Sequence, residues 1–174
     1  MGTLVAYFSR AGENYGVGDI VKGNTEVVAE LVAAKTGARL FRIRTVNEYP
    51  KDYKRCTELA REEQRRKVRP EFLGVLPDVS EYDTVFLGYP NWWGDLPMAV
   101  YAFLEALDFS EKTIVPFCTH EGSGLSGTAE TIRRLCPGAE VLDGFEVRGR
   151  FCQGSLGKME ATVESGLAKV PHLA

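Results

Sequence analysis

The sequence predicts an α/β fold in which helices cover both faces of a parallel sheet. Short apolar segments of strand length, such as Thr3–Phe8 and Thr84–Tyr89, alternate along the chain with segments of helical periodicity. Thr84–Tyr89 is apolar throughout, which is typical of a strand buried on both faces. Strands that alternate with helices in this way form parallel sheets joined by right-handed crossovers.

The first half of the chain contains clear local signals. A helix is expected to begin at Asn24-Thr25, where a capping residue precedes an apolar face, and to end at Gly37 in a left-handed cap. The second strand, Arg39–Arg44, is flanked by charges that suit a sheet edge. Lys51–Val68 is predicted as a charged helix, and its thin apolar stripe contains Tyr53, Cys56, Leu59 and Ala60.

The second half repeats the pattern. Pro97 can occupy the start of a helix, and Thr113–Cys118 is the fourth predicted strand. Pro116 lies inside that strand and removes a ladder donor, so we expect a bulge or an unpaired position there. The remaining predicted elements are a helix near Thr128–Leu135, a strand near Val141–Val147 and a final helix near Leu156–Lys169. The five strands predict a single domain over residues 1–174.

Composition excludes several classes of protein. The 174 residues suffice for one well-buried domain, and the 44% apolar and 26% charged shares are those of a soluble globular protein. A net charge of −3 gives no reason to expect nucleic acid as a partner. No segment approaches the ~20 apolar residues of a membrane span. No positively charged segment precedes Thr3–Phe8, so we expect a strand there and not a signal peptide.

Cysteine and histidine usage argues against a metal centre. The four cysteines show no C-x-x-C spacing and are expected to be reduced thiols in a cytoplasmic protein: Cys56, Cys118, Cys136 and Cys152. With only His120 and His172 present, a histidine-based metal cage is not expected, and the cysteine spacing does not support cysteine-only ligation. We therefore predict no metal.

The fold class places the functional site beyond the carboxyl ends of the strands, where the strand order reverses. Three segments follow strands one, three and four and should converge there. They are Ser9–Gly12, Pro90–Asp95 and Thr119–Gly124, here named the first, second and third loops. Each is rich in glycine, hydroxyl or aromatic residues.

The first loop has features of a phosphate site. Ser9 offers a hydroxyl, Arg10 a cation, and the helix that opens at Asn24-Thr25 offers free amides and a favourable dipole. A capped helix with a solvated arginine is the alternative. The phosphate turn could lie wholly within Ser9–Asn14, or Gly12–Gly23 could loop out and leave the role to Asn24-Thr25. We favour the second arrangement, because only a helix N-terminus supplies aligned donors.

The second loop contains two adjacent tryptophans, Trp92 and Trp93, between a strand and a helix. Neighbouring side chains of an extended segment point to opposite sides, so at least one indole should line the loop surface. An exposed indole is a natural partner for a planar, electron-poor ring system. The alternative is that both tryptophans fill the seam between helix and sheet or form a protein interface; we favour ring stacking.

The third loop does not carry a hydrolytic motif. Ser123 lies directly between Gly122 and Gly124, so the G-x-S-x-G nucleophile elbow is absent, and H-E-x-x-H zinc spacing is absent too. The glycines would instead let backbone amides approach the edge of a ligand. His120 is either a ligand contact or a polar rim residue.

Three sequence segments resemble the flavodoxin family, particularly members with an extended first loop. The first segment is YFSR together with the later GNTE, the second is GYPNWWGDLPMAV and the third is PFCTHEGSGL. The resemblance as a whole runs from Thr3 to about Gly149. The resemblance implies a flavodoxin-like doubly wound sheet of five parallel strands in the order 2-1-3-4-5. It also implies noncovalently bound FMN, with the phosphate at the first loop and the isoalloxazine between the second and third loops.

The resemblance assigns cofactor-binding roles but no catalytic residue. The phosphate contacts would be Ser9, Arg10, Ala11, Asn24 and Thr25. The ring and ribityl chain would be held by Pro90, Asn91, Trp92, Trp93, Gly94, Thr119, His120, Glu121, Gly122, Ser123 and Gly124.

Two functions fit such a site. The protein could be an electron carrier between redox partner proteins, a flavin reductase or similar donor and an unidentified acceptor. It could instead be an FMN-dependent reductase of quinones with a nicotinamide donor. We favour the carrier, because no second Gly-rich nucleotide motif occurs. The segment 51–71 carries eight Lys or Arg against five Asp or Glu, which fits a solvated helix or, as a minority hypothesis, a docking site for an acidic partner.

Overall fold

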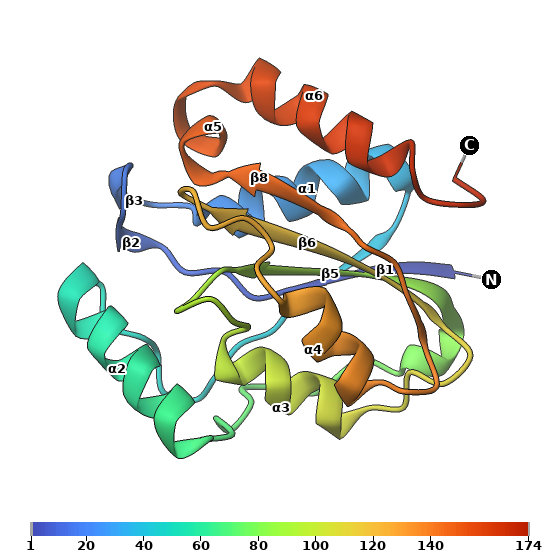
Figure 1. Ribbon diagram of the computed structural model, residues 1–174, viewed down its shortest axis with the longest axis horizontal. Coiled ribbons are helices and arrows are strands. Elements are labelled where there is room, and N and C mark those ends of the chain that lie inside the picture. Colours follow the sequence, from blue (N-terminus) through green and yellow to red (C-terminus); the bar gives the residue numbers. More distant parts are fainter. Residues whose placement is uncertain (1, 174) are drawn as a thin grey trace.

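The computed structural model, which describes residues 2–173, has a parallel sheet between two layers of helices (Figure 1). The strands of the sheet are β1 (Gly2–Tyr7), β4 (Arg39–Arg42), β5 (Tyr82–Pro90), β6 (Thr113–His120), β7 (Glu140–Val141) and β8 (Phe145–Arg148). Their order is β4-β1-β5-β6-β7, with β8 also paired to β6, and all pairs are parallel. Because β7 and β8 share the fifth position, the predicted order 2-1-3-4-5 is confirmed.

The helices divide between the two faces. Figure 1 shows α1 and α6 on one face and α3 and α4 on the other, while α2 lies beside the sheet next to the hairpin of β2 (Gly12–Asn14) and β3 (Gly18–Ile20). The bounds of the helices are α1 (Asn24–Thr36), α2 (Tyr53–Arg66), α3 (Met98–Ala106), α4 (Thr128–Leu135), α5 (Gly149–Gly154) and α6 (Leu156–Leu167). A 3-10 turn, Val79–Glu81, leads into β5. Within residues 2–173 no helix is long and apolar enough to cross a membrane.

The core lies on both sides of the sheet because successive side chains of each strand point to opposite faces. Leu87 of β5 packs in the cluster that includes α3 and α4, whereas Phe86 packs in the cluster that includes α1 and α6. Both side chains are fully buried. The continuous apolar character of β5 is therefore the consequence of burial on two faces, as the sequence predicted.

The position of Pro116 agrees with the expected interruption. Pro116 lies in the middle of β6 and is in register with Leu87 of β5. On the other side, β7 pairs with β6 only up to Ile114 and β8 begins to pair at Phe117. The Ile114 carbonyl accepts from Leu142 on that side, and alternate residues direct their backbone groups to the same neighbour. Pro116 therefore faces the gap between β7 and β8, where β6 needs no backbone N–H donor.

Several boundaries differ from the sequence-based expectation. The strand expected near Val141–Val147 is divided into β7 and β8 at this break, and the short helix α5 was not predicted. The segment Gly12–Gly23 does loop out, and it contains an antiparallel hairpin of β2 (Gly12–Asn14) and β3 (Gly18–Ile20). The edge strand β4 is shorter than expected and pairs only with β1. The edge position that its flanking charges predicted is confirmed.

Replacing Gly88 with alanine is expected to lower the free energy of unfolding by about 1–3 kcal/mol, the usual range for an overpacked core. Gly88 lies in the central strand β5, and an added Cβ would overlap the ring of Phe117 on β6. Urea denaturation followed by circular dichroism measures the change. Gly157→Ala is the matched control: Gly157 lies exposed in the first turn of α6 with open space around its Cβ, so this variant should be as stable as the wild type or more stable, by less than ~1 kcal/mol. Equal effects of the two substitutions would contradict this account of the sheet.

Candidate functional site

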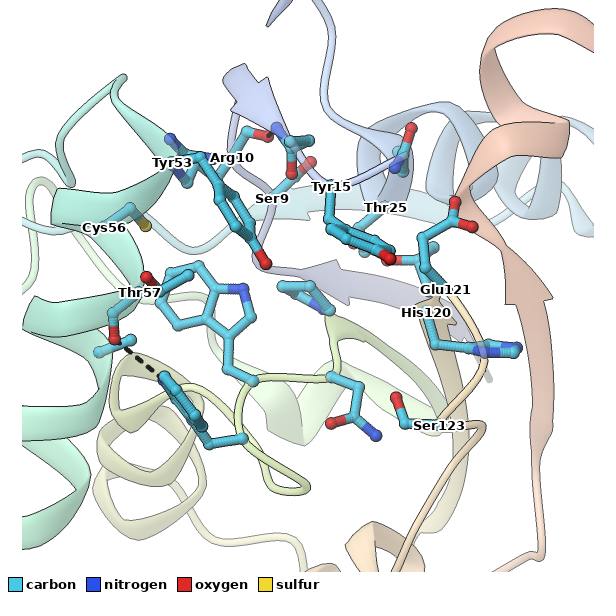
Figure 2. A pocket seen from close by; sticks show the side chains of 18 residues that line it. Ser9, Arg10, Tyr15, Thr25, Tyr53, Cys56, Thr57, His120, Glu121 and Ser123 are labelled. Atoms are coloured by element: carbon cyan, nitrogen blue, oxygen red, sulfur yellow. Dashed lines mark hydrogen bonds between the residues drawn. The ribbon is translucent and has the colours of Figure 1, made fainter. Parts of the chain in front are cut away.

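A cavity of about 580 Å³ lies at the carboxyl edge of β1, β5 and β6, where the three loops converge. It brings together most of the residues that the sequence singled out. These are Ser9, Arg10, Asn24, Thr25, Pro90, Asn91, Trp92, Trp93, Thr119, His120, Glu121 and Ser123. Figure 2 shows residues of α2 and of the third loop on opposite sides of this cavity. The convergence of three loops on one site was predictable, because parallel strands end at the same edge of a sheet.

Four predicted residues do not line the cavity: Ala11, Gly94, Gly122 and Gly124. Ala11 lines a second hollow on the other side of the first loop. The three glycines all have positive φ and lie in the turns of the second and third loops. At Gly124 a Cβ would meet the Glu146 carboxylate, so this glycine permits a close approach of two segments of the protein.

Six lining residues were not among the predicted site residues: Asn14, Tyr15, Tyr53, Cys56, Thr57 and Ala60. The first two belong to the β2–β3 hairpin segment and the other four to α2. The rings of Tyr15 and Tyr53 are 6.2 Å apart and link the hairpin to α2 near the cavity (Figure 2). The thin apolar stripe of α2 was the available signal, since Tyr53, Cys56 and Ala60 are part of it.

The amino end of α1 supplies the donors at one end of the cavity. The Oγ of Ser9 accepts a hydrogen bond from the Glu26 amide at 3.0 Å, and the Val27 amide already bonds the Gly23 carbonyl. By helix geometry, the amides of Asn24 and Thr25 have no carbonyl partner within the helix. The Thr25 hydroxyl is buried and lies 2.7 Å from that of Thr119. Amides and hydroxyls at a helix N-terminus form a ready anion site.

Arg10 holds neighbouring segments together through hydrogen bonds of its guanidinium. Its guanidinium donates to the carbonyls of Glu13, Pro50 and Lys51, so it ties the first loop to the hairpin and to the segment that enters α2. All of these partners are neutral carbonyl groups. The positive charge of Arg10 therefore has no carboxylate partner among the described residues, and it raises the electrostatic potential around the first loop.

The second loop is a tight turn held by side chains. Trp92 and Asp95 exchange backbone hydrogen bonds, and Trp93 and Gly94 between them both have positive φ, as in a type I′ turn. Asn91 accepts from the Gly94 amide and donates to the Gly124 carbonyl, so it joins the second loop to the third. A positive φ is unusual for a residue as large as tryptophan, and strain of this kind concentrates at functional sites.

The two indoles have different environments. Trp93 is 52% exposed, and its Nε1 donates to the Thr57 carbonyl of α2 at 2.9 Å, the dashed line in Figure 2. The guanidinium of Arg61 lies 5.0 Å from the centre of the Trp93 ring. Trp92 instead packs edge-on against Phe8 and Tyr49. Trp93 thus fastens the second loop to α2, while Trp92 forms part of the cavity wall.

The indole N–H of Trp92 is a donor without a partner among the described residues. It makes no hydrogen bond to any residue between 2 and 173, yet no buried side-chain nitrogen or oxygen of the described residues lacks a partner. Nε1 of Trp92 is therefore accessible, and Trp92 is one of the residues that line the cavity.

Internal hydrogen bonds also organise the third loop. Nδ1 of His120 accepts from the Gly122 amide at 2.8 Å, and Glu121 accepts from the amide and the guanidinium of Arg150 at the start of α5. Burial lowers the pKa of His120, and the carboxylate of Glu146 partly opposes this effect. His120 is therefore the neutral acceptor that holds the turn of this loop. Within residues 2–173 no group of three His, Cys, Asp or Glu side chains is arranged to bind a metal ion.

Acidification is expected to weaken the third loop. Nδ1 of His120 can accept from Gly122 only when unprotonated, and burial lowers its pKa below the ordinary 6.5. The stabilisation is therefore fully present above pH 6.5 and is lost as the pH falls through the lowered pKa. Loss of the hydrogen bond should cost about 0.5–1.5 kcal/mol. Urea unfolding at about pH 7.5 and 5.5 measures this change.

The control for this titration is His120→Gln, whose side-chain oxygen can accept a hydrogen bond but does not titrate. Its free energy of unfolding should depend less on pH over this interval than that of the wild type. Identical pH dependence of the two proteins would show that protonation of His120 does not affect the loop.

Known structures share this architecture. A candidate flavoprotein from Bacteroides eggerthii DSM 20697 is 27% identical, with a TM-score of 0.70, over 91% of this chain and 97% of its own. A candidate flavoprotein from Bacteroides uniformis ATCC 8492 is 25% identical, with a TM-score of 0.71, over 94% and 97%. A flavoprotein from Lactobacillus acidophilus NCFM, solved in complex with FMN, is 20% identical, with a TM-score of 0.67, over 91% and 97%.

No curated protein matches the sequence. The flavodoxin family model, in contrast, matches residues 2–163, nearly the whole chain. The match includes all three loops and α2. The chain therefore belongs to the flavodoxin family.

Proposed function

We propose that the protein binds FMN in the 580 Å³ cavity and transfers electrons between redox partner proteins. The observation that carries the proposal is the continuity of this cavity. It runs from the amino end of α1, which suits a phosphate, to the aromatic wall of the second loop, which suits a flat ring. The Lactobacillus acidophilus flavoprotein with the same fold contains FMN, which supports the same cofactor here.

The amino end of α1 is suited to the FMN phosphate. The amides of Asn24 and Thr25, which have no carbonyl partner within the helix, and the positive end of the helix dipole favour an anion. The Thr25 hydroxyl can donate one further hydrogen bond when Thr119 donates to it. Arg10 contributes its charge at short range, while its hydrogen-bond donors stay on carbonyl groups.

The second and third loops are suited to the ring. Trp92 provides an aromatic wall and a free N–H, and Asn91 holds the two loops at a fixed separation. When bound, FMN supplies reversible uptake and release of electrons. The chain binds the phosphate, orients the ring and keeps water from one side of it. A preformed site of this kind lowers the entropic cost of binding the cofactor.

A carrier function is supported by the surface beside the cavity. Trp93 and Arg61 lie exposed at the junction of the second loop and α2, where a redox partner can approach. The partners we propose are a flavin reductase or similar donor and an acceptor protein. Four buried free thiols fit a reducing compartment, which supports a cytoplasmic location: Cys56, Cys118, Cys136 and Cys152.

A reductase function is the second candidate, and one observation favours it. Tyr53, Cys56, Thr57 and Ala60 of α2 extend the cavity wall beyond the three loops. A small acceptor such as a quinone could occupy the space between α2 and the flavin. The cavity would then hold both cofactor and substrate.

Thr25→Ala is expected to weaken FMN binding about 10- to 100-fold, which corresponds to about 1.5–3 kcal/mol for a charge-assisted hydrogen bond. Riboflavin, which lacks the phosphate, should bind the variant and the wild type equally. Quenching of flavin fluorescence by the flavin-free protein measures both affinities. Thr25→Ser keeps the hydroxyl and serves as the control. A loss of the same size for both ligands would refute the phosphate assignment.

The purified protein is expected to be yellow or to take up one FMN per chain. A colourless protein that does not quench FMN fluorescence would refute the central proposal. Reduction of the loaded protein only through a partner reductase would support the carrier. Steady-state oxidation of NAD(P)H with a quinone by the protein alone would support the reductase instead.

A further inference from the structure

A second hollow, of about 290 Å³, lies on the other side of the first loop from the FMN cavity. Its walls come from the first loop, from the residues that follow β4 and from the segment that enters α2. The charged residues that line it are Arg10, Arg42, Arg44, Glu48 and Lys51. It shares Ser9 and Arg10 with the FMN cavity, so the two hollows are neighbours.

The charges of this hollow are unbalanced. Arg42 forms an ion pair with Glu26 at 3.2 Å, and Glu48 is the one carboxylate among the lining residues. The side chains of Arg44 and Lys51 make no hydrogen bond or ion pair with any residue from 2 to 173. A concentration of free cations is unexpected in a protein whose net charge is −3.

Arg10 adds a fixed positive charge to the wall. Its Nε and Nη2 donate to the Pro50 carbonyl at 3.1 and 2.8 Å, so the guanidinium cannot turn away. Its partners are carbonyl groups, which leave the charge uncompensated. A charged group held in a partly buried position acts more strongly on a ligand than a mobile surface charge does.

The remaining surface of the hollow is apolar. Phe8 and Ile43 are buried at its floor, and Tyr49 is held in place because its hydroxyl donates to Glu63 at 2.6 Å. A rigid apolar floor beside free cations suits an anion that carries an organic group. The guanidinium of Arg44 is well matched to phosphoryl oxygens, because it offers paired donors in one plane.

We propose that this hollow binds a diphosphate group, either free or as part of a nucleoside diphosphate. The cations come from three separate segments of the chain, so they can neutralise more than one phosphoryl group. The site is separate from the FMN phosphate site, which lies at the amino end of α1. A nucleotide bound there would lie beside the flavin cavity, because Ser9 and Arg10 form the wall between the two hollows.

Calorimetric titration of the FMN-loaded protein with pyrophosphate, ADP and inorganic phosphate tests the proposal. The loaded protein is used because FMN fills the amino end of α1 and leaves the second hollow as the site under test. Pyrophosphate and ADP should bind with one site per chain, and phosphate should bind more weakly. Tighter binding of ADP than of pyrophosphate would identify a nucleotide as the ligand, and equal affinities would identify the free anion.

The variants Arg44→Gln and Lys51→Gln should each weaken pyrophosphate binding about tenfold, since each removes one charged donor. Arg39→Gln in β4 and Lys54→Gln in α2 are matched controls. Both control positions are exposed and lie outside the two hollows, so these variants should bind as the wild type does. The FMN affinity should be the same in all four variants.

Absence of pyrophosphate and ADP binding to the wild type would overturn the proposal. An equal loss in all four variants would also overturn it, because it would indicate nonspecific attraction to positive charge. Were the protein unable to bind FMN, the same titration of the flavin-free chain with these variants would still decide the question, because the controls do not depend on the cofactor.

Discussion

The hydrogen bond between the Ser9 hydroxyl and the Glu26 amide is the constraint on which the site depends. Ser9 follows β1, and Glu26 lies in the first turn of α1, with the β2–β3 hairpin between them in sequence. The bond keeps the amino end of α1 against the carboxyl end of β1 despite this insertion. Gly23 permits the contact, since a Cβ there would overlap the Ser9 hydroxyl. The first residues of α1, Asn24 and Thr25, therefore line the cavity.

A second set of contacts fixes the opposite end of the cavity. Asn91 joins the second loop to the third, and Trp93 joins the second loop to α2. Gln64 of α2 also donates to the Trp93 carbonyl, at 3.4 Å. These bonds hold Trp93 at a positive φ that a large side chain rarely adopts. The position of α2 and the shape of the second loop are thereby coupled.

The two hollows on either side of the first loop share the positive charge of Arg10. Arg10 forms part of both walls, and its guanidinium donates to the carbonyls of Glu13, Pro50 and Lys51, none of which carries a negative charge. The acidic groups near the cavity are engaged elsewhere: Glu121 accepts from Arg150, and Glu146 accepts from the Leu125 amide. The first loop is consequently a positive region between two concave surfaces, although the chain as a whole is acidic. This arrangement favours anionic ligands on both sides.

Much of the fold and part of the site were determined by the sequence alone. The alternation of short apolar strands with helical segments gave the sheet, and the break at Pro116 followed from its missing amide. Parallel strands end at one edge, so the loops after β1, β5 and β6 had to meet, and the sequence identified them by their hydroxyl, glycine and aromatic residues. Ser9, Thr25 and Trp92, which were singled out in this way, line one cavity in the structure.

The tertiary structure decided what depends on contacts between distant segments. Tyr53 and Cys56 line the cavity because α2 packs beside it, and helical periodicity predicts an apolar face without saying what that face contacts. The different environments of Trp92 and Trp93 arise from a bond to Thr57, 36 positions away. The sequence predicts Arg10 near a phosphate from its charge, and packing decides that its guanidinium donates to the carbonyls of Pro50 and Lys51. Local sequence fixes which side chains are present, whereas packing fixes which of their donors and surfaces remain free.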